Sequence, residues 1–239
     1  MRSTWVCLAA TAALLVAYTV IAGVAARSEP SGGSSGAGLP TEPLDNVGTG
    51  VVFMAQFAVL ALATMVIATE YATGSIRSTL QWVPVRYRML LAKSIVVFPV
   101  LFVMGMVLTP LGLGSGLLAL GDAADPVTAS DTVGRALAVG GYLGTAGVIV
   151  IGVGAAVRSV AGTLTVAFLV MLVLPMIMQS TSVEILSKAA NYLPGPAGMT
   201  LMGVSEDPVY GTPVAIALLA FWAVAANAAG WWVLRSRDA

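Results

Sequence analysis

The chain has 239 residues, of which 58% are hydrophobic and only 9% are charged, whereas soluble domains average about 25% charged residues. This composition excludes an ordinary soluble domain and is typical of an integral membrane protein. The 11 basic and 11 acidic residues cancel, and we expect no nucleic acid partner.

Cutting the sequence at every charged residue leaves six uncharged runs that are long enough to cross a membrane. A bilayer core about 30 Å thick needs roughly 20 apolar residues of helix, because backbone polar groups in lipid must bond within their own segment. We therefore predict a single all-α transmembrane domain over residues 1–239. Its six transmembrane helices are expected at about residues 4–26, 48–69, 90–120, 136–157, 159–181 and 212–234.

The first run could instead be a signal peptide, because Met1-Arg2 precedes it and Val24-Ala25-Ala26 resembles a cleavage site. Its apolar stretch is longer than the roughly 7 to 15 residues of a signal core, which favours a retained span. Residues 27–46, rich in Ser, Gly and Pro, are then predicted to form a flexible external loop.

Lys and Arg indicate the orientation, because positively charged loops stay in the cytoplasm. With the N-terminus inside, only Arg27, Arg135 and Lys188 of the 11 basic residues face out. Both termini are then cytoplasmic. Arginine together with abundant Ala, Gly and Val suggests a GC-rich bacterial genome, so we expect the bacterial cytoplasmic membrane.

Residues 70–80, between the second and third spans, suit a short helix on the cytoplasmic surface. Tyr71, Ile76 and Leu80 can form an apolar side, whereas Glu70 and Arg77 are polar. Pro84 ends this element, because proline disfavours helical geometry in the residue before it. An ordinary positively charged loop is the alternative interpretation.

Three acids in the loop before the fourth span, Asp122, Asp125 and Asp131, raise the possibility of a metal site. Their spacing lacks the D-x-[DN]-x-[DN]-G arrangement of a calcium loop. Solvated turn residues are the better interpretation. Cys7 is the only cysteine and histidine is absent, which excludes a Cys-based cluster and disfavours a proton relay. We expect no catalytic residue, no metal site and no cofactor bound by this chain.

Small residues recur at helical spacing within the spans, as Gly112 with Gly116 and Gly140 with Gly144. Such pairs let helices approach closely, and packing within the bundle is favoured over a dimer seam. Gln56 and Asn227 are polar residues inside spans that either bond to neighbouring helices or face a substrate path.

The run 189–205 is short and is broken by Pro194, Gly195 and Pro196, which predicts a re-entrant or surface segment. No P-loop pattern G-x-x-x-x-G-K-[ST] occurs, so this chain cannot by itself hydrolyse a nucleotide through such a loop.

The pattern Glu70-x-x-x-Gly74-Ser75-Ile76-Arg77-x-x-Leu80, followed by Pro84, an arginine cluster and Lys93, resembles the permease subunit of type-2 ABC exporters. The six-span topology and the stretch Asn191-Tyr192-Leu193-Pro194 are similar to that family as well. These permeases usually begin with an amphipathic helix, and Arg2-Ser3-Thr4-Trp5 looks like the tail of one.

The resemblance implies a cytoplasmic coupling helix that docks into a separate ABC ATPase subunit, which binds the ATP and Mg. The coupling residues would be Glu70, Tyr71, Gly74, Ser75, Ile76, Arg77, Leu80, Arg86 and Arg88. It also implies a second permease, with an amphipathic cargo, drug, lipid or peptide moving between the two past spans two and five. Gln56 and Asn227 would line this path, and the segment 184–205, with Leu193 and Pro194, would form the external gate.

Two other functions are compatible with the same sequence. The first is a membrane immunity or scaffold protein that binds a partner without transport. The second is a lipid-modifying membrane enzyme, for which the three external acids would be the only candidates.

Overall fold

The computed structural model describes the chain except for residues 1, 29–42, 73–85, 122–123, 125, 182, 206–207 and 237–239, and it describes only the backbone of residues 2–5, 28, 68–72 and 86. The described part is helical and contains no strand. In chain order the elements are α1 (Arg2–Ser28), α2 (Pro43–Gly50), η1 (Val51–Ala55), α3 (Gln56–Ala72), α5 (Arg86–Leu120), α6 (Ala129–Val157), α7 (Val160–Phe168), η3 (Leu169–Val173), α8 (Leu174–Ser180), α9 (Glu184–Ala190), α10 (Pro194–Leu201) and α11 (Thr212–Ser236).

Six helical segments in the described residues are long and apolar enough to cross a membrane. For the described residues, the prediction of an all-α protein with six candidate transmembrane helices is therefore confirmed. The second span is a composite of α2, the π-helical turn η1 and α3, and the fifth is a composite of α7, the π-helical turn η3 and α8. The six segments are Val6–Arg27, Pro43–Ile67, Tyr87–Leu120, Ala129–Val157, Val160–Ser180 and Thr212–Ser236.

Two helices begin earlier in the sequence than the predicted spans. The fourth span begins at Ala129 rather than at residue 136, because Thr128 caps the helix by accepting a hydrogen bond from the backbone N–H of Asp131 at 3.2 Å. The loop predicted over 27–46 is helical at both of its ends, since α1 runs to Ser28 and α2 begins at Pro43. Pro43 and Asp45, both in the first turn of α2, favour a helix start at this point. Residues 29–42 of the loop lie outside the described residues.

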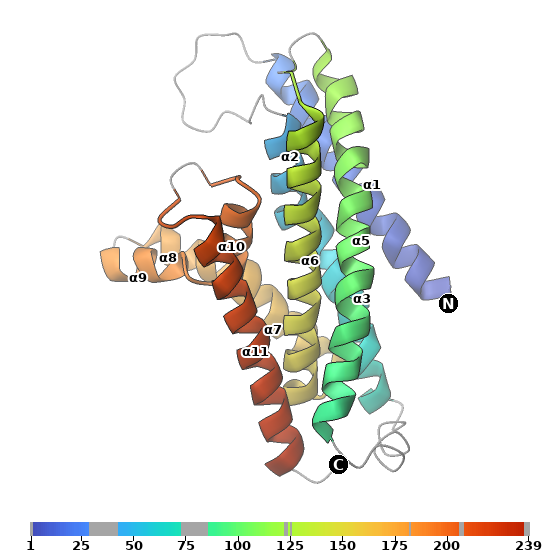
Figure 1. The fold of residues 1–239 in the computed structure, drawn as a ribbon, viewed down its shortest axis with the longest axis vertical. Coiled ribbons are helices and arrows are strands. Elements are labelled where there is room, and N and C mark those ends of the chain that lie inside the picture. The colour runs from blue at the N-terminus through green and yellow to red at the C-terminus, as the bar shows by residue number, and fades with distance from the viewer. Residues whose placement is uncertain are drawn as a thin grey trace.

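Helix α6 occupies the centre of the bundle, and α3, α5, α7 and α11 pack around it (Figure 1). Its glycines allow this close packing. A Cβ atom on Gly140 would lie 2.7 Å from the carbonyl oxygen of Phe102 on α5, and one on Gly152 would lie 2.4 Å from the carbonyl carbon of Ala226 on α11. Backbones touch where these glycines lie, which gives the van der Waals contact that holds helices together in lipid.

The glycine pairs singled out by spacing also lie at contacts within the chain. Gly144 faces the ring of Phe98 on α5, 2.9 Å from the position of its missing Cβ. The corresponding distance from Gly112 to Val47 is 3.1 Å. Both glycines are therefore explained by helix packing within this chain.

Successive spans run in opposite directions (Figure 1). At the upper end in this view, α1 and α5 finish together, where the Arg27 Nε donates a hydrogen bond to the Leu120 carbonyl at 2.6 Å. At the lower end, the Arg158 Nη2 donates to the Val233 carbonyl at 3.3 Å and joins α6 to the end of α11. The end of α3 and the start of α5 also lie at the lower end.

Candidate functional site

The residues predicted to contact an ATPase lie between the second and third spans. Glu70 and Tyr71 belong to the last turn of α3, and Arg86 begins α5, but only their backbones are described. Arg88, in the first turn of α5, has an exposed side chain. The other members lie outside the described residues: Gly74, Ser75, Ile76, Arg77 and Leu80. Their role in coupling stays a prediction.

Gln56 lies in the interior of the bundle, directly after the π-helical turn η1. Its Oε1 accepts a hydrogen bond from the hydroxyl of Tyr142 on α6 at 2.6 Å, and both side chains are 0% exposed. The Nε2 of Gln56 is buried and has no hydrogen-bond partner among the described residues. A buried donor without an acceptor costs about 1–3 kcal/mol. The Gln56 and Tyr142 pair is therefore a polar site that helix packing alone does not require.

The second and fifth spans each contain one π-helical turn, η1 and η3. Such turns are frequent at functional sites, because the wider turn interrupts the regular ladder of helical hydrogen bonds. The two spans lie side by side, and the rings of Phe57 and Phe168 are 5.1 Å apart. Both π-helical turns also contact α10. These are the spans that the family resemblance assigns to a substrate path.

The segment broken by prolines forms the short helices α9 and α10, and α10 is packed into the bundle. A Cβ on Gly198 would lie 2.2 Å from the Tyr142 ring, and one on Gly195 would lie 1.9 Å from the Met171 carbonyl oxygen in η3. The absence of these side chains lets α10 contact α6 and η3 at once. Leu193 and Pro194, which were predicted to form a gate, are buried at the start of α10. Their gating role stays a prediction.

The turn that leads into α10 accepts hydrogen bonds from one residue in α11 and from one residue just before it. The Trp222 Nε1 donates to the Tyr192 carbonyl at 2.8 Å, and the Tyr210 hydroxyl donates to the Asn191 carbonyl. Burial raises the pKa of Tyr210, so its hydroxyl remains a protonated donor at neutral pH. Movement of α10 would therefore be transmitted to α11.

Asn227 connects three spans. Its Nδ2 donates to the Val148 carbonyl on α6 at 3.1 Å and to the Ala223 carbonyl at 2.9 Å, and its Oδ1 accepts from the Ser94 hydroxyl on α5 at 3.3 Å. The sequence allowed Asn227 either to bond to neighbouring helices or to face a substrate path. These contacts show that it bonds to neighbouring helices. A place for Asn227 in a substrate path stays a prediction.

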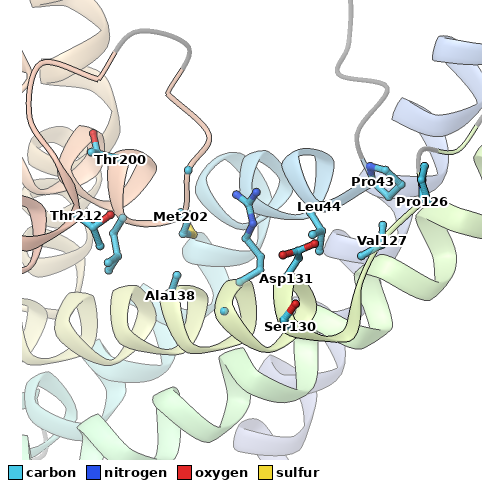
Figure 2. Close-up of a pocket in the computed structure, with 14 residues that line it drawn as sticks. Pro43, Leu44, Pro126, Val127, Ser130, Asp131, Ala138, Thr200, Met202 and Thr212 are labelled. Carbon is cyan, nitrogen blue, oxygen red and sulfur yellow. The ribbon is translucent and has the colours of Figure 1, made fainter.

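A cavity of about 560 Å³ opens near the upper end of the bundle, among the starts of α2, α6 and α11 and the end of α10 (Figure 2). Figure 2 shows Asp131 and Ser130 on one wall, with Met202 and Thr212 on another. Arg135 also lines the cavity, and its Nη2 donates to the Asp45 carboxylate of α2 at 2.7 Å. Its guanidinium thereby joins α6 to α2.

Sequence reasoning missed Arg135 as a site residue and treated it as one of the external loop charges. The signal that could have found it is Thr128-x-x-Asp131, a capping-box pattern that predicts a helix start at Ala129. Of the three acids in the metal hypothesis, Asp131 accepts a hydrogen bond from the Thr128 hydroxyl at 2.6 Å as part of that cap. Asp122 and Asp125 lie outside the described residues.

Composition and fold together define a multi-pass helical membrane protein embedded in the lipid bilayer. No protein-family model matches the chain, and no curated protein is significantly similar to it.

Proposed function

We propose that this chain is the permease subunit of an ATP-driven exporter of the type-2 ABC class, in the bacterial cytoplasmic membrane. The observation that carries the proposal is the ordered pattern from Glu70 to Leu80, placed between the second and third of six spans. Both chain termini and residues 70–88 then face the cytoplasm. A separate ABC ATPase subunit binds ATP and Mg and docks on residues 70–88.

The geometry around this segment suits the transmission of force. Helix α3 reaches from Gln56 to Ala72 without interruption, and α5 continues from Arg86 to Leu120 over 35 residues. A partner that moves the segment between them would act on two spans together. Exposed Arg88 and the charge of Glu70 are suited to charge-assisted hydrogen bonds with that partner.

The proposed path for cargo runs between two permease copies, or between this chain and a sibling chain, and faces spans two and five. The π-helical turns in both spans support this choice. Helix α10, which contacts both turns, would act as the external gate with Leu193 and Pro194 at its start. Residues 46–69 and 159–183, which include most of spans two and five, carry no charge and suit an amphipathic cargo better than a small ion.

Copurification tests the partner directly. The tagged full chain is purified in mild detergent from its native host, beside a variant with residues 70–80 scrambled, and associated proteins are identified by mass spectrometry. We expect an ATPase subunit with the wild-type chain and its loss from the scrambled chain at equal membrane insertion. Absence of an ATPase from both samples contradicts the exporter and favours the scaffold or immunity function.

Two point variants test coupling itself. We expect Glu70→Ala and Gly74→Leu to abolish ATP-dependent export while leaving insertion and expression at wild-type levels. Glu70 would lose a charge-assisted bond, and a side chain at residue 74 would block close backbone approach. Efflux is measured in inverted vesicles. Arg235→Ala is the matched control, because Arg235 is an exposed charge at the end of α11, outside residues 70–88; unchanged export by Glu70→Ala and Gly74→Leu would refute the coupling role.

A further inference from the structure

Arg135 on α6 lies between two other parts of the chain at the upper end of the bundle. Its Nη2 donates to the Asp45 carboxylate of α2 at 2.7 Å. Its Nη1 lies between α2 and the connection from α10 to α11, because a Cβ placed on Gly48 would be 3.5 Å from this atom and one on Gly203 would be 3.6 Å from it. The guanidinium therefore joins three segments of the fold.

The start of α2 also packs directly against the connection from α10 to α11. A Cβ on Gly48 would lie 2.3 Å from the Val204 Cγ2 and 3.7 Å from the Met202 Cβ. Val204 can lie this close to α2 only because residue 48 has no side chain. Since Asp45 is in the first turn of α2, loss of its ion pair would release the start of the second span from both α6 and this connection.

Asp45 satisfies the Arg135 guanidinium only in part. The Arg135 side chain is 12% exposed, and its Nη1 is buried without a hydrogen-bond partner among the described residues. A charge that has been removed from water is strongly destabilising when it loses its partner. Arg135 can therefore leave Asp45 only if a second carboxylate is within its reach.

Asp131 supplies a second carboxylate. It precedes Arg135 by four residues on α6, and side chains at this spacing are neighbours on a helix, with the acid on the favourable N-terminal side. Both residues line the same cavity of about 560 Å³, and Asp131 is exposed on its wall (Figure 2). The Asp131 Oδ2 accepts a hydrogen bond from the Thr128 hydroxyl at 2.6 Å. A carboxylate has room for further donors.

An exchange of partners between the two acids conserves charge. One arginine and two carboxylates carry the same net charge in both pairings, and the arginine is paired in each. The acid that is left over faces water, because Asp131 is exposed and Asp45 is already 25% exposed. The two pairings can therefore have similar free energies, as a two-state element requires.

From these observations we infer that Arg135 is a two-position switch that controls the upper end of span two. In the closed state, which this structure shows, Arg135 pairs with Asp45 and α2 lies against the connection from α10 to α11. In the open state Arg135 pairs with Asp131, and α2 separates from that connection. The switch acts within a single chain and holds whether or not the chain works with an ATPase.

Thiol labelling tests the open state. Met202 borders the cavity but is 2% exposed beside Gly48, so a cysteine at this position is covered until α2 moves away. Met202→Cys is made in a Cys7→Ser background, and its reaction rate with a maleimide is measured on the full chain in lipid nanodiscs. Asp45→Asn should raise this rate about tenfold, whereas Asp131→Asn should lower it about tenfold, because the open state would then leave Arg135 unpaired.

The opposite signs distinguish a switch from a simple ion pair. If Arg135 pairs with Asp45 alone, Asp131→Asn leaves the labelling rate unchanged, and that result overturns the inference. Asp131→Glu keeps the charge and should label at the wild-type rate; slow labelling of this variant as well would show an effect of the helix cap and would also overturn it. Ala146→Cys, at a position 1% exposed inside α6, is the matched control for global unfolding, and its rate should not respond to either acid substitution.

Stability gives a second, independent readout. The double variant Asp45→Asn with Asp131→Asn leaves Arg135 without a carboxylate in both states. Its unfolding equilibrium constant should therefore rise at least about tenfold more than the product of the two single-variant increases. A rise equal to that product would show that Asp131 never replaces Asp45 as the partner of Arg135, and the switch would be refuted.

Discussion

Replacing Gly152 by valine is expected to destabilise the bundle more than any other glycine substitution on the face of α6 that packs against α11. A Cβ at residue 152 would lie 2.4 Å from the Ala226 carbonyl carbon and 2.5 Å from the Asn227 nitrogen. Both are backbone atoms, which cannot rotate away. The helices would have to separate, which would also stretch the 3.1 Å bond from Asn227 to the Val148 carbonyl.

We expect Gly152→Val to lower the free energy of unfolding by roughly 3 kcal/mol, the upper range for overpacking a tight interior. Gly114→Val is the matched control, because no atom lies within 4 Å of a Cβ at Gly114; its effect should stay within about 0.5 kcal/mol. Unfolding in mixed micelles with increasing denaturing detergent measures both. Equal losses for the two variants would show that α6 and α11 do not meet at Gly152.

The six helices could be predicted from the sequence because one physical requirement dominates. A backbone in lipid must satisfy its own hydrogen bonds, so uncharged runs of sufficient length become helices whatever their detailed order. Charge was a poorer guide to where a helix starts. Asp131 and Arg135 lie inside α6, since the cap at Thr128 satisfies the first turn and its acid favours the helix N-terminus.

The candidate sites depended on contacts between distant parts of the chain, which no local pattern records. Gly140 and Gly141 are adjacent and identical in sequence, yet one touches the backbone of α5 and the other borders an open groove. Gln56 was recognised as a polar residue in a span, but its partner Tyr142 is 86 positions away. The π-helical turns have no sequence signal that composition or periodicity reveals.

Tyr142 connects the features that the proposed function uses. Its hydroxyl bonds to Gln56 in the second span, and its ring lies against Gly198 of α10. Helix α10 in turn lies against the Met171 carbonyl in the π-helical turn of the fifth span. A shift of α3 that displaced Gln56 would therefore reach α10 through one side chain. This is a short mechanical route from the helix that carries Glu70 to the proposed gate.

Removing the hydrogen bond between Tyr142 and Gln56 should destabilise the protein by an amount that depends on which of the two residues is replaced. Tyr142→Phe leaves both polar ends of Gln56 buried without partners, whereas Gln56→Leu leaves only the Tyr142 hydroxyl unpaired and also removes the orphan Nε2. We expect a loss of about 2 kcal/mol for the first and about 1 kcal/mol for the second. The double variant should lose less than the sum, because replacing both partners by apolar groups is close to neutral.

Export measured on the same variants separates a structural role of the pair from a functional one. If the hydrogen-bonded pair of Gln56 and Tyr142 only joins α3 to α6, the double variant should export at the wild-type rate, because its stability is expected to be close to that of the wild type. If instead Tyr142 transmits motion to α10, or the Gln56 Nε2 is used for cargo, the double variant should export at least tenfold less while its stability in mixed micelles stays near that of the wild type. We expect the second result, because Tyr142 bonds to Gln56 and its ring lies against Gly198 of α10, so that loss of the pair breaks the route to the proposed gate. Additive stability losses in the double variant would instead show that Gln56 and Tyr142 do not interact.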